Sequence, residues 1–376
     1  MVNFRKYLLF ILIAVISLTT VSCEKERRYH SNQLLLYVAA NNNLSPYAAH
    51  NIDSLARGYL PRDKRRDDVV LLYYHVPSES PILYKYFNDK EGNCKRETLV
   101  TYDVNTLSAD VNTLRTVIAD ADKACPAKTH SLVLWSHATG FLPPGYYYEP
   151  KDTKSFAVDG VDTDNEMDIK DMASALTHHY DFILLDCCLM GGIEVAYELR
   201  NKCSYLIMSP TEVLAESFSY LTLTSDINYY SNLEESLKRV CDHYMAKNSY
   251  KDCTVALIKC SELDNLASVS SSIFRNHRQE LAALDPEYVQ EYFRYDKHWF
   301  YDFGDIMQQI ASFSEYASVT QALDKAVIYK DAADSFLGVP IYKYSGLSMY
   351  LPNPKYTYLN NYYKSLQWNK STGLVE

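Results

Sequence analysis

Hydrophobic residues in the first half of the chain gather in short, almost uninterrupted runs. Longer segments lie between them, and there the apolar positions recur with helical spacing. Runs of the first kind are typical of strands buried on both faces of a sheet, and the spacing of the second kind is typical of amphipathic helices. This alternation predicts an α/β fold with a mostly parallel sheet and helices on both faces. The expected buried strands cover residues 34–39, 67–76, 132–136, 182–185 and 205–209.

Between these runs the sequence predicts helices and one hairpin. At Asp168 an aspartate precedes an apolar stripe, and Asp171 follows three residues later, which is the pattern of a capped helix start. Residues 82–87 and 97–102 alternate in polarity around a polar turn and predict an antiparallel hairpin. The other expected helices cover residues 47–56, 105–123 and 191–200.

The second half of the chain has a more helical pattern, with no intervening stretch rich in Pro, Gly or Ser. We therefore expect a main domain over residues 32–230 and a mainly helical region over residues 231–376 that docks on it. The expected helices cover residues 232–246, 262–280 and 303–317, and strand-like pieces occur at 253–258 and 346–351.

The amino terminus has the pattern of a signal peptide. Arg5 and Lys6 precede an apolar core over residues 7–18, which is too short to span a bilayer comfortably. The small residue Ser22 directly before Cys23 resembles the bacterial lipobox, in which the cysteine is lipidated and becomes the new first residue.

From this pattern we predict a lipoprotein-type signal peptide over residues 1–22, lipidation of Cys23 and a polar tether over residues 23–31. One departure from the lipobox is Thr20, which stands where leucine is preferred. The expected location is the bacterial outer membrane, on its periplasmic or surface face, with the lipid as the anchor.

Charge narrows the range of partners. The chain has 47 acidic and 37 basic residues and a formal net charge of −10. Removal of residues 1–22 takes away the two positive charges of Arg5 and Lys6 and no acid, so the mature charge is −10 − 2 = −12. An acidic, exported chain argues against nucleic acid as a partner. Its 376 residues are enough to bury a complete core.

Besides Cys23 the chain has eight cysteines with irregular spacing, and no CxxC pair suggests zinc or redox chemistry. In an oxidising compartment some of them could form disulfides. The simpler interpretation is scattered buried thiols for all but one. The eight are Cys94, Cys125, Cys187, Cys188, Cys203, Cys241, Cys253 and Cys260.

Two of the buried runs end on side chains suited to nucleophilic catalysis. Residues 131–140 contain His137, and residues 181–192 contain Cys187 and Cys188. Because the carboxyl ends of parallel strands line one crevice, we expect the imidazole and a thiol to meet there. A thiol becomes a good nucleophile as a thiolate, which a neighbouring base or a helix amino terminus favours. A histidine about fifty residues before the cysteine, each at a strand end, has the order and spacing of caspase-type cysteine peptidases.

The residues alone leave alternatives for this pair. Successive side chains point to opposite sides of a strand, so only one of Cys187 and Cys188 can face the crevice. The alternative for either thiol is a structural, buried cysteine, and the alternative for His137 is a histidine with a purely structural role.

Other groups are expected at the same edge. Asp186, two residues before Cys188, is a candidate to select Arg or Lys by charge-assisted hydrogen bonds, or else a group that caps the next helix or hydrogen-bonds the turn. Glu216, after the following strand, is a candidate second carboxylate of the pocket. The backbone N–H groups of Ala138 and Cys188 are candidates to bind a developing oxyanion.

The segment after the histidine contains two further features. Residues 141–157 carry Lys151 and Lys154, which beside a site for basic residues are candidates for self-cleavage; an ordinary loop is the alternative. The following stretch is rich in carboxylates, whose oxygens suit calcium, although the glycine of an EF-hand loop is absent and solvated acids are the simpler interpretation. These acids are Asp159, Asp162, Asp164, Glu166 and Asp168. We expect no required cofactor, with calcium as an open option.

Over most of the mature chain these motifs resemble the clostripain family of cysteine peptidases, the C11 family with a caspase-like fold. The cysteine motif Leu185-Asp-Cys-Cys-Leu-Met-Gly191 is the specific one and is similar to the family's usual Asp-Ala-Cys-Leu-Met. The supporting matches are residues 34–44, 135–140, 194–199, 209–212 and 346–352.

The resemblance implies a caspase-like catalytic domain that hydrolyses peptide bonds after Arg or Lys through a thioester acyl-enzyme. It implies that Cys188 is the nucleophile, that His137 is the general acid and base, and that Asp186 binds the P1 side chain. It also implies activation by cleavage after a basic residue between histidine and cysteine, here Lys151 or Lys154. The expected partners are peptides and proteins with Arg or Lys at P1.

Two residues depart from the family pattern. Ala138 follows the histidine where the family usually has glycine, so its methyl group would crowd the oxyanion site or forbid a positive φ. Asn41 replaces a commoner aspartate. Both departures keep open a second hypothesis, in which the chain is a weakened or inactive family member that binds basic peptides or a cell-surface partner.

Overall fold

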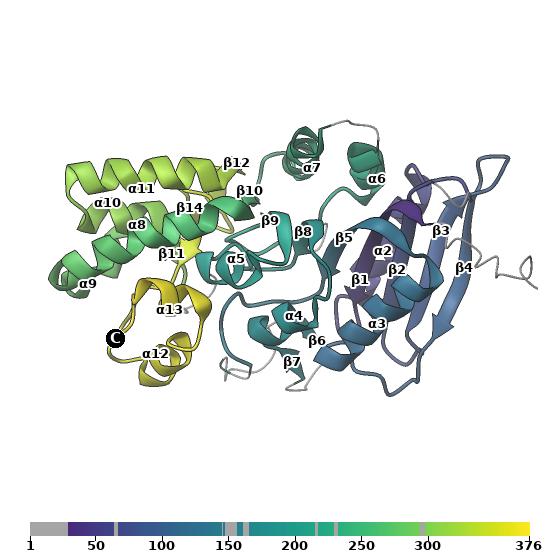
Figure 1. The fold of residues 1–376 in the computed structure, drawn as a ribbon, viewed down its shortest axis with the longest axis horizontal. Helices are drawn as coiled ribbons and strands as arrows, with labels where there is room; N and C mark the ends of the chain where they lie inside the picture. The colour runs from purple at the N-terminus through teal and green to yellow at the C-terminus, as the bar shows by residue number, and fades with distance from the viewer. Residues whose placement is uncertain are drawn as a thin grey trace, which may run out of the picture.

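A computed structural model describes residues 29–63, 67–144, 146, 156–160, 165–214, 217–228, 232–293 and 298–376. Its centre is a sheet of nine strands (Figure 1). In chain order these strands are β1 (His30–Ala39), β2 (Val69–His75), β3 (Ile82–Asn88), β4 (Cys94–Thr101), β5 (Ala127–Trp135), β8 (Tyr180–Asp186), β9 (Cys203–Met208), β10 (Thr254–Lys259) and β12 (Val327–Ala332). Their order across the sheet is β12-β10-β9-β8-β5-β1-β2-β3-β4.

The five central strands β2, β1, β5, β8 and β9 pair in parallel. Antiparallel strands complete both edges, with β3 and β4 on one side and β10 and β12 on the other. The prediction of an α/β fold with a mostly parallel sheet is therefore confirmed. Three small antiparallel pairs lie outside this sheet: β6 (Phe156–Val158) with β7 (Glu166–Met167), β11 (Tyr301–Asp302) with β15 (Ser348–Met349), and β13 (Ser335–Phe336) with β14 (Val339–Pro340).

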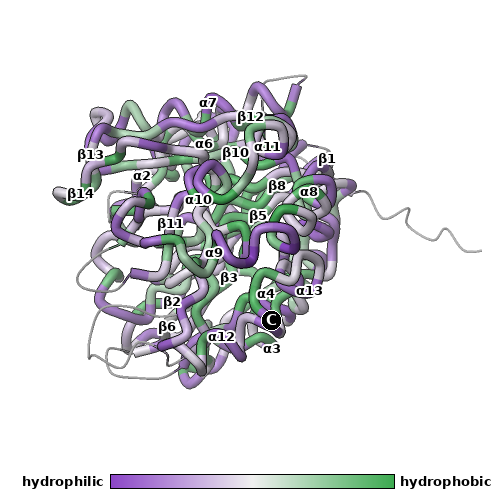
Figure 2. Tube along the Cα trace, turned by 90° about the vertical axis from the view of Figure 1, so that its left-hand side faces the viewer, coloured by the Kyte–Doolittle hydropathy of each residue, from purple (hydrophilic) through white to green (hydrophobic). Residues whose placement is uncertain are grey.

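The alternation of side chains along β1 explains why both faces of the sheet are covered. Leu34, Leu36 and Val38 belong to one hydrophobic cluster, whereas Leu35 and Tyr37 belong to the other. Figure 2 shows the hydrophobic trace concentrated in the interior around β5 and β8.

The helices divide between these two clusters. The Leu34 face is covered by α2 (Ser45–Arg57), α6 (Tyr220–Asn228) and α7 (Leu233–Lys247). The Leu35 face is covered by α3 (Val111–Ala124), α4 (Ile169–Ala175), α5 (Ile193–Leu199), α8 (Leu263–Asn276), α9 (Arg278–Ala283), α10 (Phe303–Ile310), α11 (Phe313–Ala326), α12 (Thr357–Tyr363) and α13 (Gln367–Thr372).

Polar caps explain where the observed helices differ from the expected ones. The helix expected over residues 303–317 is two helices, because Ser312 starts α11 with a capping box that pairs it with Glu315. The helix expected from residue 105 begins only at Val111, because the Asp110 side chain accepts hydrogen bonds from the N–H groups of Asn112 and Thr113.

The carboxyl-terminal region contributes to the sheet as well as packing on it. Strands β10 and β12 come from this region, and β10 pairs with β9. The strand-like piece expected at residues 253–258 is thereby confirmed as β10, and the sheet extends past residue 230. No helix within the described ranges is long and apolar enough to cross a bilayer. The predicted signal peptide and Cys23 lie outside the described residues.

The eight described cysteines are free thiols, and all but Cys94 and Cys188 are buried. The interpretation of scattered buried thiols is confirmed for these six. Among them Cys203 and Cys260 are in contact, with 3.6 Å between their sulfur atoms.

Candidate active site

The register of two neighbouring strands brings the predicted histidine and cysteine together at the carboxyl ends of these strands. β5 and β8 pair in parallel, and Trp135 at the end of β5 lies opposite Asp186 at the end of β8. His137 and Cys188 each follow two residues later, so the chain leaves the sheet beside the same crevice at both positions.

Two glycines allow the segments that follow these strands to approach closely. A Cβ atom at Gly140, which has φ of +63°, would lie 2.6 Å from the carbonyl oxygen of Leu189. A Cβ atom at Gly191 would lie 2.2 Å from the backbone nitrogen of Pro210. The histidine segment, the cysteine turn and the segment after β9 therefore pack directly on one another.

These segments enclose a pocket with a volume of about 480 Å³. His137 and Cys188 are half-buried in its lining, which leaves both side chains accessible. The pocket thus brings together four of the residues singled out from the sequence. The polar or chemically relevant residues of its lining include Asn43, His137, Ala138, Asp186, Cys188, Glu212 and Ser217.

The imidazole of His137 is held by a residue that the sequence analysis missed. Nε2 of His137 lies 2.7 Å from Oδ1 of Asn43, which follows β1 at the same edge of the sheet. The backbone carbonyl of His137 accepts a hydrogen bond from the N–H of Ala157 at 3.1 Å. The polar run at residues 41–43, directly after a buried strand, was the available signal for Asn43.

The two adjacent cysteines have different surroundings. Cys187 is buried and its thiol lies 3.0 Å from the carbonyl oxygen of Leu134. Burial raises the pKa of the Cys187 thiol well above its ordinary value, so this sulfur stays protonated. Cys188 lines the pocket, and its sulfur lies 3.5 Å from the carbonyl oxygen of Val213. As expected from the alternation along the strand, only one of the two faces the crevice: Cys188 lines the pocket and Cys187 packs inward.

Asp186 is a buried carboxyl group in the pocket wall, with an exposed fraction of 3%. Its Oδ2 atom accepts hydrogen bonds from the hydroxyls of Ser217 and Tyr220, the latter at 2.8 Å. Its Oδ1 atom is buried without a hydrogen-bond partner among the described residues. Burial raises the pKa of Asp186 to about 6, and the two hydroxyls oppose this shift. The alternative that Asp186 caps the next helix is wrong, because Gly192 is the N-cap of α5.

The two departures from the family pattern have local explanations. Ala138 is buried and lines the pocket, and it is not among the described non-glycine residues with positive φ. The backbone there accepts an alanine without strain. The side-chain amide of Asn41 donates to Oδ1 of Asp159 at 3.2 Å, a position where an aspartate would place two carboxylates together.

Asp159 and Asp168, two of the five acids considered for calcium, are held by donors from the protein. Asp159 is buried and accepts a hydrogen bond from the N–H of Ala109 at 2.7 Å, so its interpretation as a solvated acid was wrong. Asp168 caps α4 and accepts a hydrogen bond from the hydroxyl of Tyr362. Asp162 and Asp164 lie outside the described residues, as do Lys151, Lys154 and Glu216.

Comparison with known proteins gives a consistent result. The family model described as "Clostripain family" matches residues 36–373. An inactive zymogen C11 protease from Parabacteroides distasonis is 32% identical; the match covers 91% of this chain and 97% of that one, with a TM-score of 0.80.

A secreted C11 cysteine protease from Bacteroides thetaiotaomicron, solved with an irreversible peptide inhibitor, has the same fold. It is 24% identical, with 91% and 98% of the two chains covered and a TM-score of 0.78. Comparison with curated proteins gave no match.

Proposed function

The chain belongs to the clostripain family of cysteine proteases, and from that premise we propose that it is an endopeptidase that cleaves after Arg or Lys through a dyad of Cys188 and His137. The observation that carries the proposal is the shared pocket, in which a half-buried thiol and imidazole lie with a buried carboxyl group, Asp186.

In the proposed reaction His137 takes the proton of the Cys188 thiol, and the thiolate attacks the scissile carbonyl carbon. The C–S bond forms, and the backbone N–H groups of Ala138 and Cys188 stabilise the oxyanion. His137 then donates the proton to the leaving amine as the C–N bond breaks, which leaves a thioester. Water attacks this thioester, His137 accepts the water proton, and the C–S bond breaks to release the acid and restore the thiol.

Asn43 is proposed as a positioning residue for this proton transfer. Its side-chain oxygen lies 2.7 Å from Nε2 of His137, which matches a hydrogen bond from a protonated Nε2. In that tautomer Nδ1 is unprotonated and is the nitrogen that accepts the proton from sulfur.

The charge of the pocket wall supports the proposed preference for a basic P1 residue. Asp186 and Glu212 are acids, and none of the described lining residues is a lysine or arginine. A guanidinium or ammonium group that reached Asp186 would supply a partner for Oδ1 and favour the charged carboxylate. Glu216, outside the described residues, remains the proposed second carboxylate.

Self-cleavage after Lys151 or Lys154 is proposed as the activating step. The segment that follows these residues is anchored beside the site: Ala157 N–H donates to the carbonyl of His137, and Gly160 N–H donates to the carbonyl of Asn41 at 2.6 Å. A cut upstream would therefore leave the new end attached next to His137. The similar protein from Parabacteroides distasonis is described as an inactive zymogen, which agrees with activation by cleavage.

We also propose export and lipid anchoring at Cys23, on the basis of the amino-terminal sequence pattern. The relative from Bacteroides thetaiotaomicron is described as secreted. A Cys23→Ala variant is expected to leave the membrane fraction, with the parent chain retained there. Equal membrane retention of both would contradict the anchor.

The activity test uses the purified chain, before and after limited nicking with trypsin that is then inactivated. Fluorogenic peptides with Arg, Lys, Asp or Leu at P1 are compared, each with and without added calcium. We expect hydrolysis of the Arg and Lys peptides only, and none by the Cys188→Ala variant treated in parallel. Equal signals from the parent and the variant would eliminate the peptidase and favour the second hypothesis, a binding protein for basic peptides that Ala138 first suggested.

Self-processing has its own readout. Intact-mass analysis after incubation is expected to show a cut after Lys151 or Lys154 in the parent chain and not in Cys188→Ala. A cut of the same extent in both proteins would refute self-processing and leave the activity assay unaffected.

A further inference from the structure

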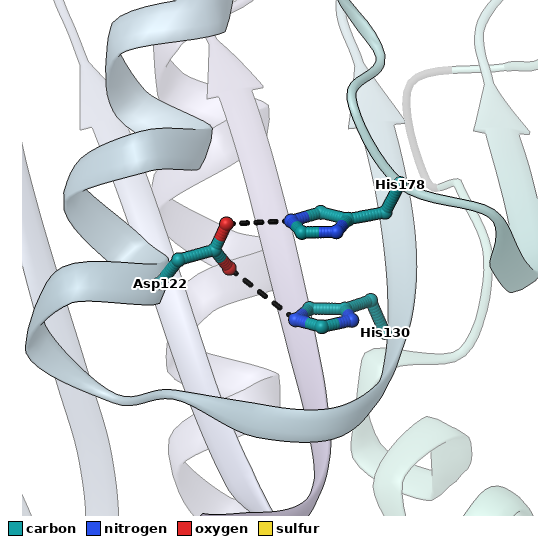
Figure 3. Close-up of side chains that lie close together, drawn as sticks. All are labelled: Asp122, His130 and His178. Carbon is teal, nitrogen blue, oxygen red and sulfur yellow. Dashed lines mark hydrogen bonds and ion pairs between the residues drawn. The ribbon is translucent and has the colours of Figure 1, made fainter. Parts of the chain in front are cut away.

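Three potential metal ligands meet near the amino-terminal ends of the central strands, whereas the pocket lies at the carboxyl ends of these strands. Asp122 lies in the last turns of α3, His130 near the start of β5, and His178 just before β8. Figure 3 shows the carboxylate of Asp122 facing the two imidazoles, which lie one above the other. All three side chains are half-buried.

The geometry of this cluster is compact. Nε2 of His178 lies 2.5 Å from one oxygen of Asp122, and Nε2 of His130 lies 3.3 Å from the other. The imidazole planes differ by 2°, with 3.9 Å between their centroids. The three ligand atoms all lie within 4.8 Å of one another. Tetrahedral zinc holds its ligands at about 2.0–2.2 Å, which separates them by roughly 3.3–3.6 Å. The two stacked imidazoles would therefore splay apart to point both Nε2 atoms at one ion.

We propose that Asp122, His130 and His178 form a binding site for a first-row divalent metal, of which zinc is the best fit. Imidazole nitrogens are borderline donors, and two of them with one carboxylate oxygen form a ligand set that suits zinc better than calcium or magnesium. A dication between them would be neutralised in part by the carboxylate, and it would take the place of the protons that the imidazoles now offer to Asp122.

A second observation points to a fourth ligand. The hydroxyl of Tyr180 is buried and has no hydrogen-bond partner among the described residues. Its ring stands edge-on to His178 at 5.9 Å between centroids. A metal-bound water in the open position would give this neutral hydroxyl a partner.

The position of the site indicates a structural role. His130 and His137 lie toward opposite ends of β5, so the metal would not reach the pocket chemistry. It would instead join the end of α3 to the starts of two central strands. Gln33 already supports this arrangement, since its side-chain amide donates to the carbonyl of Cys125 just beyond α3. This inference does not depend on the proposed peptidase activity.

The test uses untagged protein carrying Cys188→Ala, so that the pocket thiol cannot bind metal. After dialysis against a chelator, Zn²⁺ binding is measured by calorimetry, and Co²⁺ binding by its visible absorption. We expect one equivalent of zinc, a rise in Tm with zinc, and a cobalt spectrum of nitrogen and oxygen ligands without a thiolate charge-transfer band. Asp122→Asn and His178→Ala should each weaken binding by about 100-fold or more.

His179→Ala is the matched control, because His179 is the next residue but contacts Ser204 rather than Asp122. It should bind zinc like the parent. Equal zinc affinity in His178→Ala, or no zinc-dependent rise in the parent's Tm, would overturn the proposal and leave a carboxylate bridging two histidines. If a ligand variant fails to fold, the parent's stoichiometry and cobalt spectrum decide the outcome: a thiolate band or no binding contradicts the site.

Discussion

Two buried carboxyl groups flank Cys188 in the sequence, and they differ in what they face. Asp186 lines the pocket, with hydroxyl partners on Oδ2 and an unpartnered Oδ1. Glu194 is fully buried in α5, where Oε1 accepts hydrogen bonds from the N–H of Tyr350 and the hydroxyl of Tyr363. Burial raises the pKa of Asp186 to about 6 and that of Glu194 to about 7.

A raised pKa therefore does not by itself identify a substrate-binding acid. Both carboxyls also have one buried oxygen without a partner among the described residues. What separates them is access, because a ligand can reach only the carboxyl that lines the pocket. Access is thus what supports the proposed specificity role of Asp186, whereas Glu194 holds the carboxyl-terminal region on α5.

Of the substitutions at these two carboxyl groups, Asp186→Asn is expected to have the largest effect on activity. Loss of a buried charge partner for Arg or Lys should lower kcat/KM for these substrates by roughly 10²- to 10³-fold. The Tm of the Asp186→Asn variant should stay close to that of the parent protein. A variant that kept full activity on basic peptides would show that Asp186 lines the pocket but does not bind the P1 side chain.

Glu194 should affect stability rather than specificity. Its folded pKa of about 7 is above the ordinary value, so the folded state binds more protons between about pH 4.5 and 7. The contribution of Glu194 to the free energy of unfolding is therefore fully present at low pH and is lost as the pH rises through 7. The size of this loss is on the order of 3 kcal/mol. Urea unfolding of Glu194→Gln at pH 5 and pH 8 should lack this loss. The same pH slope in parent and variant would contradict it.

The pH dependence of activity should report Asp186. Because its carboxyl protonates below about pH 6, kcat/KM for an Arg peptide should fall up to tenfold per unit below that pH. The pH profile of Asp186→Asn should lack this acidic limb. It should keep any limb that is caused by the dyad of Cys188 and His137. An unchanged profile in the variant would assign the limb to another group.

Asn43→Ala should have a smaller effect, because it removes an orienting hydrogen bond and no reacting group. We expect about a tenfold loss in kcat with little change in KM, and partial recovery in Asn43→Asp. A rise in KM with unchanged kcat would instead indicate that Asn43 acts in substrate binding.

The sequence was sufficient for the elements whose signal is local. The buried strands, the strand ends at His137 and Cys188, and the cap at Asp168 all follow from apolar runs and capping residues. The partners were not predictable. Asn43 meets His137 across 94 residues, and Tyr220 meets Asp186 across 34, so these contacts depend on strand order and register. The cluster of Asp122, His130 and His178 has no motif spacing for the same reason.

Covalent capture of the nucleophile tests directly whether Cys188 is the reacting thiol. The nicked chain is incubated with a peptide that ends in lysine and carries a thiol-reactive ketone, and the adduct is located by peptide mapping. We expect a single adduct on Cys188 that is strongly reduced in His137→Ala and in Asp186→Asn. An adduct on Cys187, or equal labelling of Cys188 in a urea-unfolded control, would contradict it.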